Sequence, residues 1–256
     1  MKTLVYLFMS TFLMLALSGC GKSKEEIYAA MTDEEIYTEA ATALENGKYA
    51  KAIEGYQQLD AQYPFGEYTE QGQLEIIYAY YREDELPASL GAADRFIRLH
   101  PRNPHVDYAY YMRGIVKFTE NNSLVDRFLP IERGLRDLSS PRDAYNYFAE
   151  LVRLYPNSPY SVDARQRMLF IRNVLANNEL AAAEWYIKRK AYLAAANRAQ
   201  YVVEHFPEAP AVPKALAVMA YAYEQLGLDD LAVSSNELLE ENYPDSQAAK
   251  QVEHDE

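Results

Sequence analysis

The chain has 256 residues, with 25 Lys and Arg against 38 Asp and Glu, which gives a formal net charge of −13. A chain this acidic is not suited to neutralising a nucleic-acid backbone, so we expect no nucleic-acid partner. Its 23 Tyr, 9 Phe and only 10 Gly argue against disorder and against glycine-rich phosphate loops. The only cysteine, Cys20, excludes an intrachain disulfide and a thiolate metal cluster.

The N-terminal residues have the pattern of an export signal. One Lys precedes a largely apolar run, Leu4 to Leu17, which is shorter than the roughly 20 residues that a spanning helix needs. The letters LSGC at 17–20 resemble the bacterial lipobox, in which a peptidase cuts before a diacylated cysteine. We therefore expect residues 1–19 to be removed, Cys20 to carry a covalent lipid that anchors the chain to a membrane surface, and residues 20–31 to form a linker. Gly21, by resemblance to lipoprotein sorting, favours the outer membrane over the inner one.

A repeat follows the signal. An aromatic residue or His precedes Pro at the end of five apolar-periodic segments, and the intervals between these prolines are 37, 55, 51 and 37 residues. One fixed position upstream of each Pro is always small: Ala52, Ser89, Ala144, Ala195, Ala232. A second fixed position, closer to the Pro, is always large and apolar: Leu59, Phe96, Leu151, Val202, Leu239. Because the two positions are seven residues apart, they share one helix face, which a second helix can approach closely.

This pattern resembles the tetratricopeptide repeat, extended from about 34 to 37 residues. It predicts an all-α fold, an α-solenoid of about five tetratricopeptide-like helix pairs over residues 32–243, with a C-terminal tail at 244–256. The repeats lie near 32–64, 69–101, 104–156, 159–207 and 211–244. The expected helices are 32–46, 48–62, 69–82, 87–99, 104–119, 141–154, 159–176, 179–190, 192–205, 211–226 and 228–242; the two that meet near 176 can also form one long helix. No segment alternates with period two over a strand's length, so we expect no sheet.

Capping residues agree with these boundaries. Thr32 and Glu35 have the spacing of a capping box, and Gly47 follows the first helix, where a helix commonly stops. Four prolines suit the first helical position: Pro87, Pro104, Pro141 and Pro159. Three of them follow a residue suited to be an N-cap: Asn103, Ser140 and Ser158.

The second and third intervals are longer than the other two, and each contains an insertion. In the third repeat the extra residues, 120–139, lie between the two helices; in the fourth they lengthen the first helix through 180–190. Such insertions are either tolerated surface loops or part of a binding face. The insertion in the third repeat is more apolar than a surface loop without a function, since it contains Phe128, Leu129 and Ile131. We therefore take Phe128 as a candidate partner contact.

No catalytic or metal site is expected. The four histidines, His100, His105, His205 and His254, form neither a His-x-x-x-His nor a His-Glu-x-x-His pattern, and no Gly-x-Ser-x-Gly is present. The carboxylate clusters fall at expected helix ends and solvated faces. We therefore expect no enzyme activity, no metal and no cofactor apart from the lipid on Cys20.

A binding surface remains. The positions that would line the concave face of repeats one to three on the tetratricopeptide template are Tyr37, Leu44, Leu74, Tyr78, Tyr81, Tyr108, Tyr111 and Phe118. A groove lined with tyrosines suits an extended peptide, since Tyr offers a large amphipathic contact at low entropic cost. The alternative is that several of these side chains pack between repeats. We assign Tyr80 and Tyr110 to packing.

Three segments carry a more specific resemblance: YPFGEYTEQGQLEIIYAYYRE (63–83), RFIRLHPRNPHVDYAYYMRG (95–114) and LVRLYPNSPYSVDARQRM (151–168). Together with EWYIKRKAYLAAANR (184–198), they closely resemble the BamD (YfiO/ComL) family, lipoproteins of the outer-membrane β-barrel assembly machine. The resemblance covers nearly the whole chain and is loosest after about Pro207.

The resemblance implies a non-catalytic periplasmic scaffold of five repeats, anchored to the outer membrane. In that family the N-terminal repeats receive the C-terminal targeting segment of unfolded β-barrel precursors, and the C-terminal repeats hold the periplasmic domains of BamA. Other lipoproteins of the complex, BamC and BamE-like, are further implied partners. The family's Asn-Arg pair matches Asn197-Arg198, which makes Arg198 the expected contact on the BamA side. The alternative is a generic outer-membrane lipoprotein adaptor for peptidoglycan enzymes or a secretin.

Overall fold

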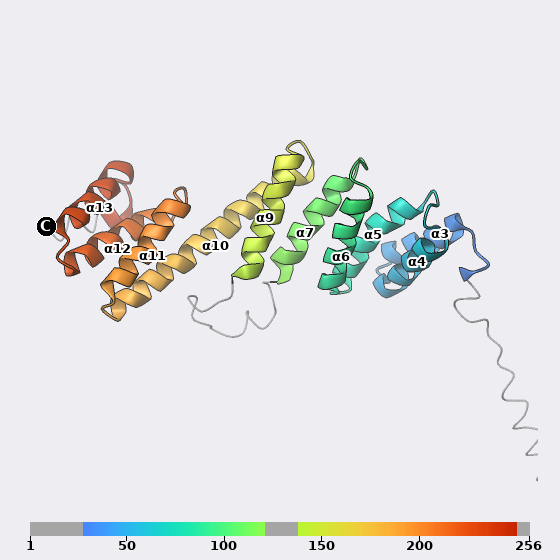
Figure 1. Ribbon diagram of the computed structural model, residues 1–256, viewed down its shortest axis with the longest axis horizontal. Helices are drawn as coiled ribbons and strands as arrows, with labels where there is room; N and C mark the ends of the chain where they lie inside the picture. The colour runs from blue at the N-terminus through green and yellow to red at the C-terminus, as the bar shows by residue number, and fades with distance from the viewer. Residues whose placement is uncertain (1–27, 121–137, 250–256) are drawn as a thin grey trace, which may run out of the picture. The chain divides into compact units, whose positions relative to one another are not determined.

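A computed structural model describes residues 28–120 and 138–249 (Figure 1). The expected signal at 1–19, the lipid site Cys20, most of the linker, Phe128 with most of the insertion, and the last residues of the tail lie outside the described residues. Within the described ranges the secondary structure is helical and contains no strand. The predicted all-α class, built from consecutive helix pairs, is therefore confirmed.

The first compact unit ends at Glu85. It contains α3 (Asp33–Glu45), α4 (Tyr49–Gln62) and α5 (Thr69–Arg82). Helix α4 packs against both α3 and α5, and α3 also touches α5. The predicted capping box at the start of α3 is present: Thr32 Oγ1 accepts from the Glu35 amide at 3.3 Å, and Glu35 Oε2 accepts from the Thr32 amide at 2.9 Å.

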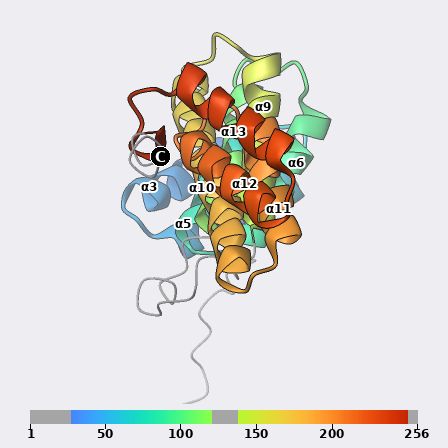
Figure 2. The same ribbon diagram turned by 90° about the vertical axis from the view of Figure 1, so that its left-hand side faces the viewer.

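The second unit begins at Leu86. Its helices are α6 (Leu86–Leu99), α7 (Val106–Glu120), α9 (Ser139–Leu154), α10 (Tyr160–Lys188), α11 (Tyr192–His205), α12 (Val212–Gln225) and α13 (Asp229–Asn242). Each helix packs against the next, and α10 also touches α7 and α12. Figure 2 views this unit from the end at which α11, α12 and α13 gather.

Close packing within the repeats rests on the small residues. The five small side chains at the fixed position upstream of the prolines are all buried, between 0 % and 8 % exposed, and so are the five large apolar residues that follow them. Gly114 in α7 lies against the Phe148 ring of α9, and an added Cβ would fall 2.3 Å from that ring. Gly55 of α4 is likewise against Ala40 of α3, where a Cβ would fall 2.7 Å from the Ala40 Cβ. The predicted helix-on-helix register is therefore confirmed.

The turn after each proline has one repeated form. The residue five positions after the Pro is buried in all five cases: Thr69, Val106, Ser161, Val212 and Ala249. The residue two positions after the Pro donates its amide to the carbonyl of the residue before the Pro, as Ser158 does to Tyr155 at 3.0 Å and Ser246 does to Tyr243 at 3.0 Å.

None of the four prolines occupies the first helical position predicted for it. Pro104 lies in the turn before α7, Pro141 is the third residue of α9, Pro159 is the N-cap of α10, and Pro87 is the second residue of α6. Ser158 and Asn103 still cap amide groups, those of Tyr160 at 3.2 Å and His105 at 2.8 Å. Ser140 instead donates its hydroxyl to Glu120 at 3.0 Å. Side chains such as Ser158 and Asn103 bond backbone amides in the turn before a helix as well as at its first residue. The sequence pattern therefore placed the starts of these helices one or two residues too early or too late.

The first helix of four repeats ends at a left-handed residue. Gly47, Asp84, Lys190 and Gly227 have φ of 70°, 66°, 59° and 68°, and each stands at the same register position relative to the Pro of its repeat. The stop predicted at Gly47 is confirmed. Glycine adopts this conformation without a steric cost, whereas Lys does not.

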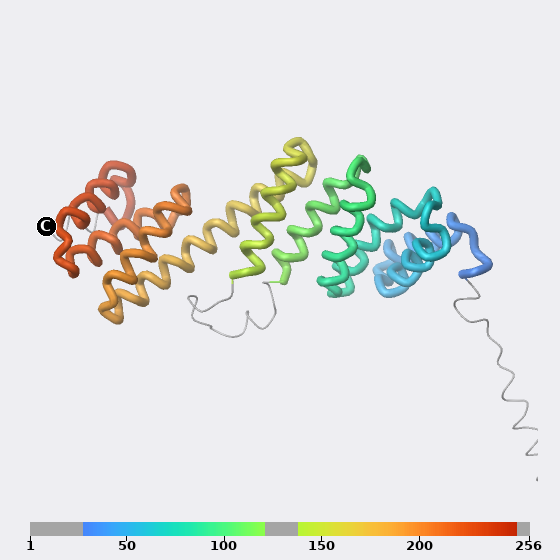
Figure 3. The backbone as a smooth tube through the Cα atoms, in the orientation of Figure 1, coloured from blue at the N-terminus to red at the C-terminus, as the bar shows by residue number. Residues whose placement is uncertain are grey.

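The insertion in the fourth repeat extends a helix. Helix α10 runs without interruption from Tyr160 to Lys188 (Figure 3), so the prediction of one long helix is confirmed and the separation at 176–179 is wrong. Ala176 and Glu179 at the predicted break are both buried inside α10.

The close approach at Gly114 is testable. We expect Gly114→Ala to lower the free energy of unfolding by about 1–3 kcal/mol, because the new methyl group would overlap the Phe148 ring. Gly91 in α6 is the matched control, since no atom lies within 4 Å of its added Cβ. There the same substitution should raise stability by about 0.5–1 kcal/mol. Urea denaturation measures both, and equal effects would contradict the packing described.

Candidate functional site

In each unit, the first helices of neighbouring repeats touch one another. Helix α3 touches α5 in the first unit, and α10 touches both α7 and α12 in the second. These first helices therefore line a shared face within each unit, which is the arrangement that the tetratricopeptide template assumes. Aromatic side chains gather on both faces, and each is described within its own unit.

In the first unit, the tyrosines are organised around Glu75 of α5. Tyr37 donates its hydroxyl to one Glu75 oxygen at 3.0 Å, and Tyr56 donates to the other. Gln71 Nε2 donates to the first oxygen at 2.7 Å. The Tyr37 ring stacks on Tyr68 with centroids 5.2 Å apart. Because the Tyr37 hydroxyl is bound within the protein and Tyr56 is buried, the partly exposed rings of Tyr37 and Tyr68 are the parts of this cluster that remain for an external contact.

The electrostatics of this cluster keep the tyrosines protonated. Burial raises the pKa of Tyr37 to about 12, and the negative charge of Glu75 adds to the effect. Burial also raises the pKa of Tyr56 well above its ordinary value, together with the hydrogen bond to Glu75. Both side chains are thus hydrogen-bond donors to Glu75 throughout the neutral range.

A second group in the same unit combines aromatic rings with a cation. The Arg82 guanidinium lies 4.7 Å from the Tyr49 ring centroid and donates to the Tyr78 hydroxyl at 2.5 Å. Tyr78 also contacts Tyr49 edge-on at 6.4 Å and lies 6.4 Å from Tyr81. The contacts with Arg82 fix the rings of Tyr49 and Tyr78 at the end of α5.

The second unit has its own aromatic cluster between α7 and α10. Tyr111 stacks on Tyr160 with centroids 5.0 Å apart, and Tyr108 lies 5.5 Å from the same ring. The Tyr111 hydroxyl donates to Asp163 at 2.7 Å, and Arg167 donates to the same oxygen at 2.5 Å. As around Glu75, a carboxylate binds the tyrosine hydroxyl and leaves the rings as the contact surface.

The charges at Asp163 and Tyr111 are coupled. Burial acts to raise the pKa of Asp163, but the hydrogen bonds from Arg167 and Tyr111 outweigh it and lower that pKa. Burial, with the bond to Asp163, raises the pKa of Tyr111 to about 12. At neutral pH the pair is therefore a carboxylate accepting from a protonated phenol.

Apolar side chains continue this surface along α10. The Arg167 guanidinium lies 4.9 Å from the Phe118 ring, and Phe118 meets Phe170 at 5.9 Å. Phe170 is 59 % exposed. An exposed aromatic side chain beside Phe118 favours a binding surface over a packing role.

The structure distributes the predicted groove residues unevenly. Partly exposed side chains, as a groove requires, belong to Tyr37, Leu44, Tyr78, Tyr81, Tyr108, Tyr111 and Phe118. Leu74 is only 7 % exposed, so the prediction that it lines a groove is wrong; it is buried in a helix that packs against both α3 and α4.

Tyr80 and Tyr110, predicted to be packing residues, do pack, but neither is fully buried. The Tyr80 hydroxyl accepts from Gln57 at 2.7 Å, and the Tyr110 ring lies 5.4 Å from Tyr155. Both thus join two helices at the edge of the core.

Sequence reasoning missed the residues that hold the tyrosines in place: Tyr68, Glu75, Tyr160, Asp163 and Phe170. Asp163 and Arg167 are spaced four residues apart, a signal for an ion pair on one helix face. The Glu75 contacts join residues 19 and 38 positions apart along the chain. No local pattern could have indicated them.

Arg198 of α11 binds a buried carboxylate of its own chain. Its guanidinium donates to Glu179 of α10 at 2.7 Å, and Arg142 of α9 reaches the other Glu179 oxygen at 3.5 Å. The Glu179 side chain is 8 % exposed, whereas that of Arg198 is 49 % exposed. The hydrogen bond to Glu179 raises the pKa of Arg198. The expected role of Arg198 as a partner contact stays a prediction, and any such contact would be made by a guanidinium already oriented by Glu179.

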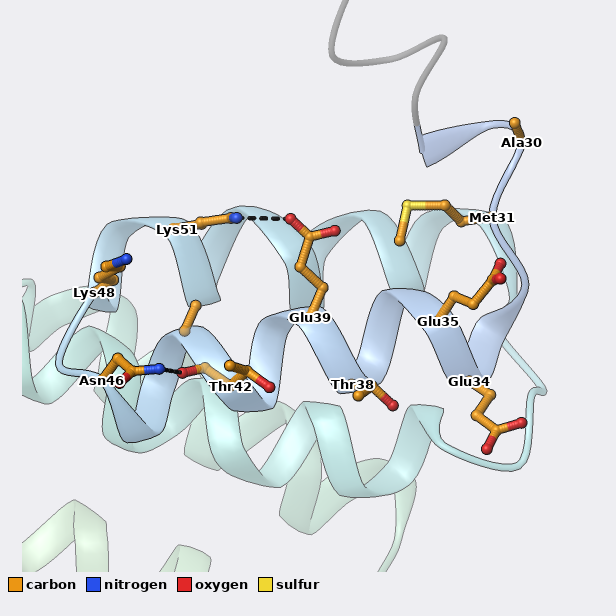
Figure 4. Close-up of a pocket in the computed structure, with 11 residues that line it drawn as sticks. Ala30, Met31, Glu34, Glu35, Thr38, Glu39, Thr42, Asn46, Lys48 and Lys51 are labelled. Atoms are coloured by element: carbon orange, nitrogen blue, oxygen red, sulfur yellow. Dashed lines mark hydrogen bonds and ion pairs between the residues drawn. The ribbon is translucent and has the colours of Figure 1, made fainter.

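A shallow pocket on α3 and α4 is lined mostly by polar and charged residues. Figure 4 shows Glu34, Glu35, Thr38 and Glu39 on α3, with the Lys51 amine of α4 paired to Glu39 at 2.7 Å. Its lining contains no histidine, cysteine or serine.

Two of the three histidines among the described residues pack against aromatic rings. His100 lies 5.0 Å from Phe96, and His205 stacks on Tyr201 at 3.9 Å. Among residues 28–120 and 138–249, no three His, Cys, Asp or Glu side chains form a group that could hold a metal ion. Over the same ranges, no helix is both long and apolar enough to cross a membrane.

The Glu75 cluster makes the free energy of unfolding decrease as the pH becomes alkaline. The folded protein binds the Tyr37 proton more tightly than the unfolded chain, because the folded pKa is about 12 and the ordinary value is 10.0. The resulting stabilisation is complete below pH 10 and is lost as pH rises from 10 towards 12. We expect Tyr37→Phe to make this decline shallower in urea titrations at pH 8 to 11. Parallel declines in the two proteins would contradict the assignment.

The structural role of Arg198 can be separated from any contact with a partner. We expect Arg198→Ala to lower the free energy of unfolding by about 1–3 kcal/mol, since it leaves the buried Glu179 with only the longer Arg142 bond. Arg142→Ala should cost less. In a Glu179→Gln background the Arg198→Ala cost should largely vanish, which a double-mutant cycle measures. A cost that is unchanged in that background would contradict the pairing.

Comparison with known proteins agrees with a lipoprotein of the outer membrane. The chain is similar to the outer membrane protein assembly factor BamD of Neisseria meningitidis strain MC58, 39 % identical over 242 residues, which are 93 % of this chain and 91 % of that protein. It is similar to the protein of the same name from Vibrio cholerae, 39 % identical over 232 residues, 90 % of this chain and 96 % of that one. Among solved structures it resembles the TPR2AB domain of yeast Sti1, with a TM-score of 0.47 and 10 % identity over 85 % of this chain and 80 % of that one.

The family comparison covers the helical region as a whole. The YfiO family, described as an outer membrane lipoprotein, matches residues 29–239. This match spans both described units from before α3 to near the end of α13. The chain therefore belongs to the YfiO family of outer membrane lipoproteins.

Proposed function

We propose that this protein is a non-catalytic scaffold for the assembly of β-barrel proteins into the outer membrane. The name of its relatives, outer membrane protein assembly factor, supports this role at 39 % identity over nearly the full length of both chains. The observation that carries the binding mechanism is the pair of aromatic surfaces, each held by a carboxylate within its unit.

The scaffold would be held at the membrane by lipid on Cys20 and would face the periplasm. Because the mature chain is strongly acidic, acyl chains rather than the overall charge would supply the attachment. Two or more acyl chains on one cysteine suffice for a stable anchor.

The aromatic surfaces would receive the C-terminal segments of unfolded barrel precursors. Such segments are extended, alternate between apolar and polar residues, and end in an aromatic residue. Tyrosine rings whose hydroxyls are already bound, as at Tyr37 and Tyr111, offer rigid faces that lose little entropy when a ligand binds. Exposed Phe170 would accommodate an apolar position of the segment.

The C-terminal repeats would hold the partner that inserts the substrate. The proposal places the periplasmic domains of BamA there, with Arg198 at the contact, and other lipoproteins of BamC and BamE-like type elsewhere on the scaffold. Holding the receptor and the insertion protein together raises the local concentration of the substrate, so a modest affinity for each segment is enough.

Peptide binding tests the proposal. A labelled peptide from the C-terminus of an outer-membrane barrel protein should bind the purified protein in a polarisation assay. Tyr78→Ala with Tyr81→Ala should weaken this binding by roughly tenfold, equivalent to about 1.4 kcal/mol, because two ring contacts are lost.

The matched control is Tyr221→Ala, which removes a 45 % exposed tyrosine of α12. It should leave peptide affinity unchanged. If the paired substitution has no effect, the peptide does not use the surface of the first unit. If the unchanged protein binds no barrel peptide and co-purifies only with peptidoglycan enzymes or a secretin, the adaptor alternative holds instead.

A further inference from the structure

The turn between α10 and α11 is basic in an acidic chain. Lys188, Arg189 and Lys190 are consecutive and all exposed, Trp185 is 40 % exposed, and Leu193 is 59 % exposed. We call these five residues the basic tip. The corresponding turns of other repeats are different: residues 83–85 read Glu-Asp-Glu, residues 45–48 read Glu-Asn-Gly-Lys, and residues 227–230 read Gly-Leu-Asp-Asp. The cluster of three cations is therefore not a feature of the repeat itself.

The cations of the basic tip are not neutralised within the described residues. The nearby carboxylate of Glu184 is paired with Lys214 of α12, and Glu179 is bound by Arg142 and Arg198. The Arg189 guanidinium lies over the Trp185 ring at 3.9 Å, a contact that leaves its charge in place. Because distant carboxylates are screened beyond about 10 Å, the local field at the tip is positive despite the net charge of the chain.

Lys190 is kept in a conformation that suits glycine. Its φ is 59°, whereas the equivalent residues are Gly47 and Gly227 in the first and fifth repeats and Asp84 in the second, and Asp adopts this region more readily than Lys. The lysine therefore strains the backbone at a position where glycine would not. Strain retained at one position of a repeat indicates that the side chain serves another purpose there.

The position of the basic tip at a helix–turn–helix end favours a flat, deformable surface as its ligand. The basic tip lies where the chain turns from α10 into α11, at one end of these two helices (Figure 1). A stable protein interface buries about 800 Å² on each partner, more than such a point offers. Lysine and arginine beside tryptophan and an exposed leucine are the residues that contact the headgroup region of bilayers.

We infer that the basic tip is a second membrane contact, which binds anionic phosphate headgroups while Trp185 and Leu193 enter the boundary between headgroups and acyl chains. This goes beyond the proposed function and does not depend on which substrate is bound. Combined with an anchor at the N-terminus, a contact at α10–α11 would restrict the orientation of the second unit at the membrane surface.

The chain contains a natural reporter for this contact, because Trp185 is its only tryptophan. The full protein, extracted from membranes, would be reconstituted into vesicles of phosphatidylethanolamine alone or with about one third phosphatidylglycerol, with brominated acyl chains. We expect Trp185 emission to shift to shorter wavelength and to be quenched at least twofold more in the vesicles that contain phosphatidylglycerol. Equal emission and quenching in both vesicles would overturn the inference.

Two variants make the test specific. Lys188→Glu with Lys190→Glu should abolish the difference between the vesicles while leaving the Trp185–Arg189 pair in place. Lys190→Gly should weaken the contact and yet raise the thermal unfolding midpoint, because strain is relieved, so loss of the signal cannot be attributed to unfolding.

The matched control reverses the charge of two exposed cations elsewhere in the second unit. These are Arg102→Glu, between α6 and α7, and Arg153→Glu, near the end of α9. It should retain the difference between the vesicles. A loss in this control equal to that at the tip would overturn the inference. A change in Trp185 emission that occurs only when a periplasmic protein is added would also overturn it, in favour of a protein partner.

Discussion

The fold depends on how closely the helices of a repeat can approach one another. At the contacts of α4 with α3 and of α7 with α9, a glycine lies against the facing helix, and an added Cβ at Gly55 or Gly114 would overlap the facing residue. Close approach lets large side chains such as Phe148 fill the remaining space without exposure. Burial of each repeat then depends on its neighbours, since one helix pair cannot cover its own apolar face.

The same dependence explains what could be predicted from the sequence. Spacing from each proline determines the small and large core positions, because burial there selects residue size directly. The aromatic surface was harder to predict. Leu74 has the expected template position, but packing around α5 buries it, and the contacts of Glu75 join residues far apart in the chain. A template position tells on which face of a helix a residue lies. The exposed fraction of its side chain also depends on which residues of other helices pack against that face.

Carboxylates have an unusual task in this protein. Glu75, Asp163 and Glu179 each accept hydrogen bonds from two or three side chains of different helices or turns. The composition, with 38 Asp and Glu against 25 Lys and Arg, predicts that the additional carboxylates lie in solvent. These three, however, organise phenols and guanidinium groups on the faces where binding is proposed, so the negative charge there supports the surface instead of repelling a ligand.

The turn after Pro244 has a consequence for the end of the helix stack. Ser246 and Ala249 reproduce the hydrogen bond and the buried position that begin a new helix in the four earlier repeats. The turn after α13 thus has the form that precedes a helix in the earlier repeats. On α13, Val233 is 55 % exposed and the buried Asn236 side-chain oxygen has no hydrogen-bond partner among the described residues. A helix that packs against α13 at these residues would stabilise α13 first, because stability in a helix stack is passed between neighbouring helices.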